Sequence, residues 1–464
     1  MSAVLKAYPA YRNSGVDWLG QVPAHWEVVR NGRLFAERNE TGFPDLPILE
    51  VSLRTGVRMR DMDGGRKQQM ADRAKYKRAV EGDIAYNIMR MWQGAVGIAP
   101  CDGLISPAYV VAKPLNDVHP RFYTYLFRTT AYMREVDFAS RGIVPDRNRL
   151  YWQYFKPLLS PTPPPDEQCR IADFLDAYTA QVHRLVAAKQ RLLKAVHERN
   201  QLALHELLVR GVDHSAPLVP SCHPWLGDVP EGWKVAPLKQ FAAVNPTLGS
   251  TLPAATEEVA FLPMERIGAD ASVDYSERRQ VQEVRSGFTS FARGDVVLAK
   301  ITPCFENGKA AWLNEMPTEI GFGTTELHVV RPNARLRPEL LLRWLRLDLF
   351  RQWGEVSMVG AAGQQRVPPR FVRDFAIAVS PSADDQERMV AKAKELDEEH
   401  RSVSGRIRRE IDLVIEYRDS LIAAVVTGRL DVRGAEITTV EDDGLAHETA
   451  GEEEDLEDMA DAAE

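Results

Sequence analysis

The chain has 464 residues, of which 44% are hydrophobic and 27% are charged. At about 150 residues per domain it is too long for one small domain. No run of about 18 apolar residues could span a bilayer, and the four cysteines (Cys101, Cys169, Cys222 and Cys304) are too widely spaced for a disulfide framework or a CxxC pair. We therefore expect a reduced, cytoplasmic protein without a membrane segment.

The net charge of -8 is unevenly distributed. Residues 441–464 hold twelve Asp or Glu and no Lys or Arg, so the remaining chain has 58 basic against 54 acidic residues, or +4. Residues 1–165 hold 23 basic and 16 acidic residues, whereas residues 222–383 hold 18 of each. The composition permits nucleic-acid binding, although a neutral domain must then concentrate its basic residues on one face.

An internal repeat organises the chain. Trp18-Leu-Gly-Gln-Val-Pro-Ala-His-Trp26 recurs as Trp225-Leu-Gly-Asp-Val-Pro-Glu-Gly-Trp233, with six of nine positions identical. Glu81-Gly-Asp83 likewise corresponds to Arg293-Gly-Asp295, and Asp166-Glu-Gln168 to Asp384-Asp-Gln386. We expect Trp18, Trp26, Trp225 and Trp233 to be packing residues, because they recur in register with Pro and Gly.

In chain order, residues 1–165 predict a first compact domain with mixed, strand-like segments between Gly and Pro residues. Residues 166–211 then change to a spacing of three and four between apolar residues, which predicts a long helix that ends at Gly211. Residues 212–221 are interpreted as a short Pro/Ser linker.

The second half repeats this order. Residues 222–383 predict a second domain, and residues 384–433 a second long helical segment with a Gly C-cap at Gly428. The narrow apolar stripes of both helices are typical of a coiled-coil seam, so we expect them to pack antiparallel at 166–210 and 384–426. Residues 434–464 form an acidic tail with few hydrophobic residues, for which we expect disorder.

Sequence motifs of common enzyme sites are missing. The sequence has no HExxH, zinc knuckle, GxxxxGK[ST], GxGxxG after a strand or GxSxG. Asn245-Pro246-Thr247 is not the Asn/Asp-Pro-Pro-Tyr/Phe loop expected of an amino-methyltransferase. We therefore expect a chain without a metal site, in which any ATP or methyl-donor chemistry belongs to partners.

Two further motifs accompany the two WLGxVPxxW copies. They are the Pro-Pro-Pro-Asp-Glu-Gln168 entry to the first long helix and the closing Leu421-Ile-Ala-Ala-Val-Val-Thr-Gly-Arg-Leu-Asp-Val-Arg433. Together these motifs resemble the DNA-specificity subunits of Type I restriction-modification systems, over nearly all of residues 8–433. Asn87 to Gly94 and Ala299 to Lys309 are similar to segments of two kinds of target-recognition domain. The acidic tail and the neutral second domain depart from the family pattern.

The resemblance implies an α+β fold with two α/β target-recognition domains in tandem, held apart by two long antiparallel helices. It implies that each domain reads one half of a bipartite, asymmetric sequence in double-stranded DNA. It also implies docking of two methyltransferase (M) subunits and recruitment of restriction/translocase (R) subunits. S-adenosylmethionine, ATP and Mg would serve these partners, and this chain would be the non-catalytic subunit of an adenine-N6-methyltransferase and restriction enzyme.

Candidate DNA-binding residues are forked donors, amides and hydroxyls that suit base edges, and Lys or Arg that suit phosphates. In the first domain they are Arg54, Arg58, Arg60, Arg66, Lys67, Asn87, Arg90, Trp92, Gln93, Arg141, Arg147 and Arg149. In the second domain they are Lys300, Thr302, Glu306, Asn307, Lys309, Thr324, Thr325, Glu326 and Arg366. We expect Lys67 to contact phosphate and Arg90 to read a base.

Each candidate has a structural alternative. A single Arg or Lys can be part of an ordinary solvated surface, Arg90 can be an ion-pair partner, and Trp92 can belong to the core. Thr324, Thr325 and Glu326 directly precede the apolar run Leu327 to Val330 and can simply begin a buried strand. At the level of the whole chain, the alternatives are a self-contained DNA methyltransferase or nuclease, and a helical scaffold that does not bind DNA.

Overall fold

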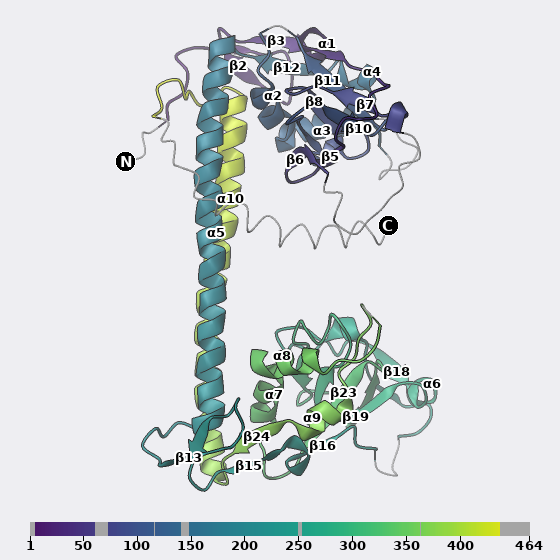
Figure 1. The fold of residues 1–464 in the computed structure, drawn as a ribbon, viewed down its shortest axis with the longest axis vertical. Helices are drawn as coiled ribbons and strands as arrows, with labels where there is room; N and C mark the ends of the chain where they lie inside the picture. Colours follow the sequence, from purple (N-terminus) through teal and green to yellow (C-terminus); the bar gives the residue numbers. More distant parts are fainter. Residues whose placement is uncertain are drawn as a thin grey trace. The chain divides into compact units, whose positions relative to one another are not determined.

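The computed structural model describes residues 5–60, 73–115, 117–140, 148–248, 253–361 and 363–436. The chain divides into two compact units. The first unit contains Met1–Gln190 and Arg408–Glu464, and the second contains Arg191–Ile407. Each unit therefore holds one globular domain and a part of each of two long helices (Figure 1).

The two long helices are α5 (Pro165–Arg210) and α10 (Ala383–Val426). Each has two acidic residues in its first turn, where the helix dipole favours negative charge. Gly211 and Gly428 follow the helices with φ of +75° and +77°, as glycines at a helix C-terminus commonly do. The predicted helices are confirmed, but the second helical segment does not reach residue 433, because the chain turns at Gly428.

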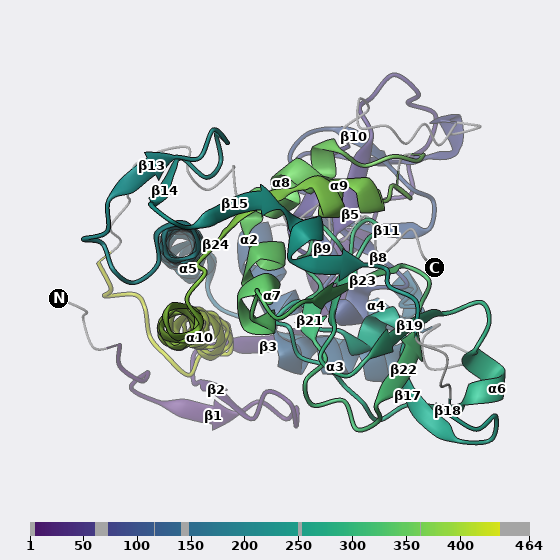
Figure 2. The ribbon, with the colours of Figure 1, turned by 90° about the horizontal axis from the view of Figure 1, so that it is seen from below.

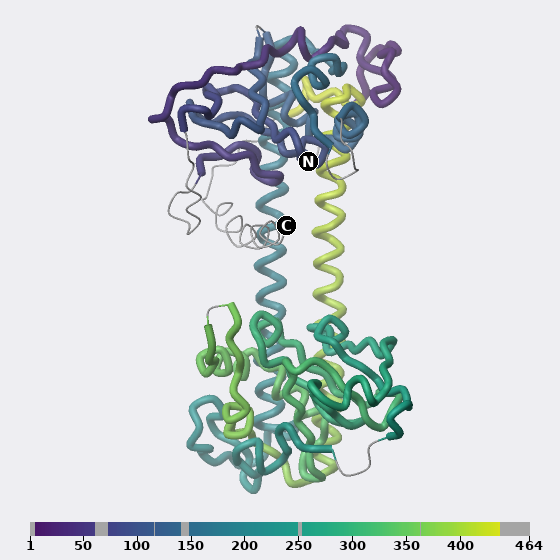
Figure 3. Tube along the Cα trace, turned by 90° about the vertical axis from the view of Figure 1, so that its right-hand side faces the viewer, coloured from purple at the N-terminus to yellow at the C-terminus, as the bar shows by residue number. Residues whose placement is uncertain are grey.

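Within each unit the two helices pack antiparallel. In the first unit, Ile171 and Leu175 share a core cluster with Leu421 and Val425, while Lys189, further along α5, pairs with Glu410, nearer the start of α10 (Figure 3). In the second unit, Leu204 and Leu208 cluster with Met389 and Ala393, and Arg199 pairs with Glu399 at 2.6 Å. The buried residues of the predicted apolar stripes therefore lie where the two helices pack, whereas Leu185, Leu192 and Tyr417 of the same stripes are exposed.

The first unit builds its domain from short strands. The main sheet has the order β4 (Phe35–Glu37), β11 (Tyr109–Pro114), β8 (Ile84–Asn87), β9 (Val96–Ile98), with all pairs antiparallel. The other pairs are β1 (Tyr11–Asn13) with β2 (Gln21–Pro23), β3 (Glu27–Arg30) with β12 (Leu159–Thr162), β5 (Leu49–Ser52) with β6 (Gly56–Met59), and β7 (Lys77–Ala79) with β10 (Gly103–Ile105).

The second unit has a matching main sheet, ordered β16 (Ala242–Val244), β23 (Leu327–Pro332), β20 (Val296–Ala299), β21 (Ala310–Trp312). A second sheet has the order β18 (Arg278–Gln280), β17 (Glu258–Leu262), β22 (Ile320–Gly323), β19 (Thr289–Ala292). The remaining pairs are β13 (Leu218–Pro220) with β14 (Asp228–Pro230) and β15 (Lys234–Pro237) with β24 (Ala376–Val379).

The strand order confirms the internal repeat. The main sheets correspond strand by strand, and β17 pairs in parallel with β22, as Ile48 bridges in parallel to Leu104 beside β5 and β10 in the first unit. The hairpin of β13 and β14 corresponds to that of β1 and β2. Residues 212–221 are therefore not only a linker, because Leu218–Pro220 is a strand of the second unit.

Helices follow the main sheets in both units. In the first they are α2 (Pro120–Phe127), α3 (Thr130–Ala139) and α4 (Trp152–Phe155), and in the second α7 (Pro338–Arg346), α8 (Asp348–Val356) and α9 (Pro369–Asp374). The shorter helices are α1 (Asn31–Leu34) and α6 (Val281–Val284), with 3-10 turns η1 (Arg73–Lys75), η2 (Met91–Gln93), η4 (Leu238–Gln240) and η5 (Met264–Arg266). Figure 2 shows α7 between the long helices and β21.

The repeated tryptophans pack where the two long helices meet. Trp26 is 1% exposed and donates its Nε1–H to Glu167 of α5 at 3.0 Å, and its ring lies against Gly428 after α10. In the second unit the ring of Trp233 lies against Gly211 after α5, close to Asp385 of α10. Trp18 and Trp225 pack against the edges of the same cores. The predicted packing role of these residues is confirmed.

The expected tail boundary at residue 434 is wrong. Ala435 is 7% exposed, belongs to the core cluster of the first unit, and accepts a hydrogen bond from the guanidinium of Arg170. The folded chain therefore continues to at least residue 436, and the rest of the acidic tail lies outside the described residues.

A buried glutamine ties each long helix to its domain. Gln168 is 1% exposed, donates to the carbonyls of Pro163 and Asp117, and accepts from the N–H of His119. Gln386 is 5% exposed and repeats this pattern with the carbonyls of Ser380 and Arg335 at 2.8 Å and the N–H of Arg337 at 3.0 Å. The N–H groups that bind the two glutamines belong to His119 and Arg337. These residues directly precede Pro120 and Pro338, where α2 and α7 begin.

We predict that Gln386→Ala lowers the free energy of unfolding by about 2 to 4 kcal/mol, because it leaves buried backbone groups without partners. Glu387→Ala, at the exposed neighbouring position, is the control and should change stability by less than about 0.5 kcal/mol. Chemical denaturation followed by circular dichroism measures both. Equal stability of the two variants would contradict the role of Gln386.

Candidate nucleic-acid interface

Candidate residues from both domains lie at corresponding ends of the main sheets, after β8 in the first unit and after β20 in the second. In the first unit, β8 ends where β11 begins, with Asn87 opposite Tyr109, and the N–H of Leu150 donates to Ile88 O at 2.8 Å. In the second unit, β20 ends where β23 begins, and the N–H of Val367 donates to Lys300 O at 2.8 Å. We call residues 87–95, 106–109 and 148–151 the first edge, and residues 300–309, 324–326 and 364–367 the second edge.

The first edge is built around a tight turn after β8. Asn87 is only 8% exposed, and its Oδ1 accepts from the N–H of Met89 at 2.9 Å. It therefore shapes the turn from beneath and is not presented on the surface, in contrast to the sequence-based expectation. Trp92 is half-buried against the core and donates its Nε1–H to Met89 O. Trp92 therefore packs against the core, as its structural alternative predicted.

Other candidates of the first edge are accessible. Gln93 and Arg149 are exposed, and Arg90 is half-exposed. Arg149 donates through Nη1 to the hydroxyl of Tyr151 at 3.3 Å. These three residues offer an amide and two guanidinium groups of the kinds that bind base edges or phosphates. DNA contact stays a prediction for each of them.

Three further arginines belong to the β5–β6 hairpin. Arg54 is exposed in the turn, whereas Arg58 and Arg60 lie on the strand side and share Glu50, at 2.7 and 3.9 Å. The buried guanidinium of Arg128 donates to the carbonyls of Leu53 and Arg54 and fixes the turn from beneath. Burial is the main cause that lowers the pKa of Arg128. The remaining candidates of this domain, Arg66, Lys67, Arg141 and Arg147, lie outside the described residues.

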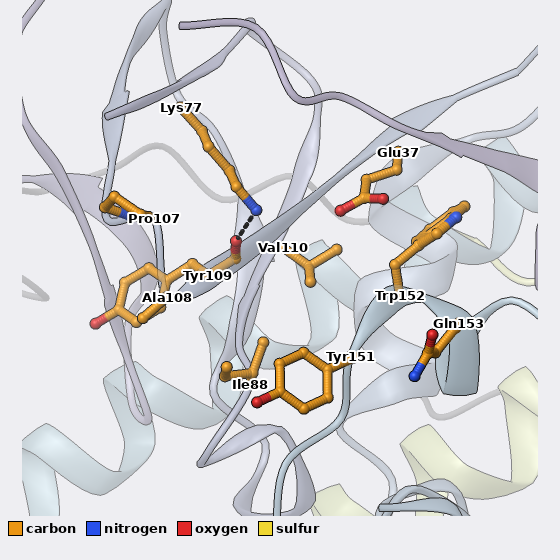
Figure 4. A pocket seen from close by; sticks show the side chains of 10 residues that line it. All are labelled: Glu37, Lys77, Ile88, Pro107, Ala108, Tyr109, Val110, Tyr151, Trp152 and Gln153. Carbon is orange, nitrogen blue, oxygen red and sulfur yellow. Dashed lines mark hydrogen bonds between the residues drawn. The ribbon is translucent and has the colours of Figure 1, made fainter. Parts of the chain in front are cut away.

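A cavity of about 430 Å³ opens beside the first edge (Figure 4). It is lined by Glu37, Lys77, Ile88, Pro107, Ala108, Tyr109, Val110, Tyr151, Trp152 and Gln153. Lys77 donates to Tyr109 O at 2.9 Å across one side of it, and burial lowers the pKa of this lysine. Lys77 and Tyr151 were not among the sequence-based candidates, because only the tertiary fold places β7 and the segment before α4 beside β11.

The second edge contains an internal ion pair. Arg366 binds both carboxylate oxygens of Glu326, at 2.8 and 2.9 Å. The hydrogen bond from Arg366 is the first cause that lowers the pKa of Glu326. Thr324 accepts the N–H of Glu326 through Oγ1 at 3.2 Å. These residues therefore hold two segments of the edge together.

The remaining candidates of the second edge differ in accessibility. Glu306, Asn307 and Thr325 are exposed, and Lys300 is half-exposed. Lys309 donates to Met264 O at 3.1 Å, and Thr302 accepts the N–H of Gln365 at 3.2 Å, so both serve contacts within the domain. The surface of the second edge is thus formed mainly by uncharged or acidic side chains around Lys300.

His328 supports the second edge from below and was missed by the sequence analysis, because it lies within an apolar run. It is 2% exposed, with Nε2 at 2.8 Å from Val367 O and Nδ1 at 3.1 Å from the amide nitrogen of Asn245. A neutral imidazole that donates a hydrogen bond from Nε2–H and accepts one at Nδ1 has a partner for both ring nitrogens. Burial is the first cause that lowers the pKa of His328.

Comparison with known proteins gives consistent relatives. The chain is 39% identical over 175 residues to the specificity subunit of the Type I restriction enzyme EcoEI of Escherichia coli, and 39% identical over 173 residues to that of EcoAI from the same organism. Each match covers 36% of this chain and 28% of the relative, so the matched part spans little more than a quarter of either relative. No family model matches the chain.

The fold also has a solved counterpart. A chain solved in work on the complex assembly and conformational transition of the type I R-M system aligns with 87% of this chain and 98% of its own length, at a TM-score of 0.62 and 15% identity. The predicted α+β fold with tandem domains and two long helices is confirmed. The curated relatives also bear out the resemblance: over 36% of its length the chain is similar to the specificity subunits of Type I restriction enzymes.

No helix among the described residues is long and apolar enough to cross a membrane. In the same part of the chain, no group of three or more His, Cys, Asp or Glu side chains is placed to hold a metal ion.

The buried neutral ring of His328 predicts a pH-dependent stability. Because its folded-state pKa is lowered, the unfolded chain binds a proton that the folded chain does not, and stability falls as pH drops below about 6.5. His328→Gln should reduce this loss by up to about 1.4 kcal/mol per pH unit. Urea unfolding at pH 7.5 and 5.5 measures it, with the exposed His214→Gln as control. Identical pH slopes for both variants would argue against a neutral His328.

Proposed function

We propose that the chain is the sequence-specific DNA-recognition subunit of a Type I restriction-modification complex. The duplicated edge is the observation that carries this proposal. Corresponding strand ends, β8 with β11 and β20 with β23, present different side chains on the same scaffold. Two such edges suit a bipartite, asymmetric DNA target, with one domain for each half-site.

Each edge is built by its own unit. Leu150 and Ile88 close the first edge, and Val367 and Lys300 close the second, through hydrogen bonds inside the respective unit. A change in one set of edge residues therefore has no need to alter the other set. We infer that the two half-sites are read independently.

The long helices are the proposed docking surface for two methyltransferase subunits. They leave large apolar side chains exposed, with Leu185, Leu413 and Tyr417 in the first unit and Leu192 and Leu202 in the second. At about 1.5 Å per residue, helices of 46 and 44 residues are long enough to act as a ruler for the DNA spacer.

The chemistry is assigned to the partners. Methyltransferase subunits would bind S-adenosylmethionine and modify adenine at N6, and restriction/translocase subunits would use ATP and Mg. This chain would contribute no catalytic residue. Its contribution is the choice of sequence.

Exchange of residues 222–383 for the matching domain of a relative should alter one half-site and leave the other intact. The reason is that the second edge depends on strands of its own unit. Sequencing of methylated adenines in cells that express the complex reads both half-sites at once. The control exchange of residues 1–165 should change the opposite half-site, and a change in both half-sites after either exchange would refute independent reading.

Arg54 and Arg90 should separate phosphate contacts from base contacts. Arg54→Ala should weaken binding to all duplexes and reduce the log-log salt slope by about 0.9, because one counterion-releasing contact is lost. Arg90→Ala should cost about 1 to 3 kcal/mol on the specific duplex alone. Titrations at several salt concentrations measure this, with thermal unfolding as the control. Equal weakening of specific and random duplexes by Arg90→Ala, without loss of stability, would make Arg90 a backbone contact.

A further inference from the structure

Two exposed apolar side chains occupy the same position in the repeat. Phe138 at the end of α3 is 89% exposed, and Val356 at the end of α8 is 85% exposed. These are the two highest values for large hydrophobic residues in the described part of the chain. The helices correspond residue by residue from Thr130 and Asp348, so that Phe138 aligns with Val356.

The opposite faces of both helices are well packed. Tyr132 and Val136 of α3 are fully buried, and Phe350 of α8 is 1% exposed, at the position that matches Tyr132. The exposed residues are therefore not the result of loosely placed helices. Single exposed apolar residues are ordinary on protein surfaces, but the duplication at one position of both domains points to a shared role.

A forked donor accompanies each apolar residue. Arg134 lies four residues before Phe138, and Gln352 lies four residues before Val356, so each pair shares one face of its helix. Both donors are exposed, and neither has a hydrogen bond or ion pair to another residue of the described ranges. Arginine suits guanine edges, glutamine suits adenine edges, and apolar side chains suit the thymine methyl group.

Both helices are fastened to the edges that carry the proposed DNA contacts. In α3, Asp137 accepts from the Nδ2–H of Asn148 at 2.8 Å, next to Arg149. In α8, Arg351 donates to Glu306 O at 2.9 Å. Gly354 of α8 packs so closely on Phe305 that an added Cβ would lie 2.3 Å from its ring.

Val359 connects the end of α8 to the second edge. It is 61% exposed, and its backbone exchanges two hydrogen bonds with Arg366, at 2.9 and 3.1 Å. The exposed apolar surface after α8 thus continues directly into the segment that carries Arg366.

We infer that the C-terminal turns of α3 and α8 contact the DNA bases, as extensions of the first and second edges. Arg134 and Gln352 supply the donors, and Phe138 and Val356 make the apolar contacts. Duplex DNA is the occupant that fits best, since an exposed phenylalanine offers about 150 to 250 Å², whereas a stable protein interface needs about 800 Å² from each partner. This inference rests on the proposed function.

The test uses the full chain assembled with its methyltransferase subunits. Four duplexes serve as probes. One carries the target sequence identified by sequencing of methylated adenines, one has a random sequence, and two carry the target with one half-site scrambled. Arg134→Ala and Gln352→Ala should weaken target binding by about 5- to 150-fold, and Phe138→Ala and Val356→Ala by about 5-fold. Binding to the random duplex should not change.

Each variant should also be specific for one half-site. The effect of Phe138→Ala should disappear when the half-site read by the first unit is scrambled, and that of Val356→Ala when the other half-site is scrambled. Leu218→Ala, an exposed position on β13 with 43% exposure, is the matched control and should bind as the unmodified chain does.

The outcomes distinguish this inference from the proposed function. If the unmodified complex shows no preference for any target, the proposed function fails. If that preference is intact and all four variants retain it, the inference about α3 and α8 is overturned. It is equally overturned if the variants keep their DNA affinity but lose methyltransferase subunits during purification, because the surface would then bind protein.

Discussion

The buried glutamine at the start of each long helix is the contact on which the rest of the structure depends. Gln168 and Gln386 each donate a hydrogen bond to a carbonyl just before their own long helix. Each also accepts a hydrogen bond from the residue that precedes a helix of the globular domain, α2 or α7. Arg121 and Arg343 reinforce this connection through Asp173 and Asp397, both at 2.7 Å. Because α2 and α7 pack on the main sheets, the position of each edge is fixed relative to the helices of its unit.

The repeat preserves geometry more strictly than residue identity. Asp83 and Asp295 are both nearly fully buried after a Gly and bind a backbone N–H three residues earlier. Their arginine partners come from different positions: Arg38 follows β4, whereas Arg331 lies in β23. A buried carboxylate requires a counter-charge from whichever strand can supply it. The edges lie on loops, where sequence can change without loss of the scaffold.

Local patterns predicted those features that depend on local physics. The helix ends near Gly211 and Gly428 follow from spacing and capping, and the duplicated domains follow from the repeat. The strand at Leu218–Pro220 pairs with the nearby Asp228–Pro230, but its Pro and Ser residues suggested a linker. The burial of Ala435 and Asn87 and the pairing of Arg366 with Glu326 depend instead on residues far away in the sequence. Composition describes such residues as tail or surface, because no local signal reports a distant partner.

The two globular domains differ in their balance of basic and acidic residues. The second domain contains as many acidic as basic residues, and Arg331, Arg343 and Arg366 are each engaged in an internal ion pair. Its edge therefore presents mainly neutral donors such as Asn307 and Thr325 around Lys300. The first domain has seven more basic than acidic residues, although Arg58 and Arg60 of its β5–β6 hairpin share Glu50. Phosphate attraction scales with the number of released counterions. Under the proposed function, we therefore expect the first unit to supply most of the salt-dependent affinity for DNA and the second unit to contribute chiefly through base contacts.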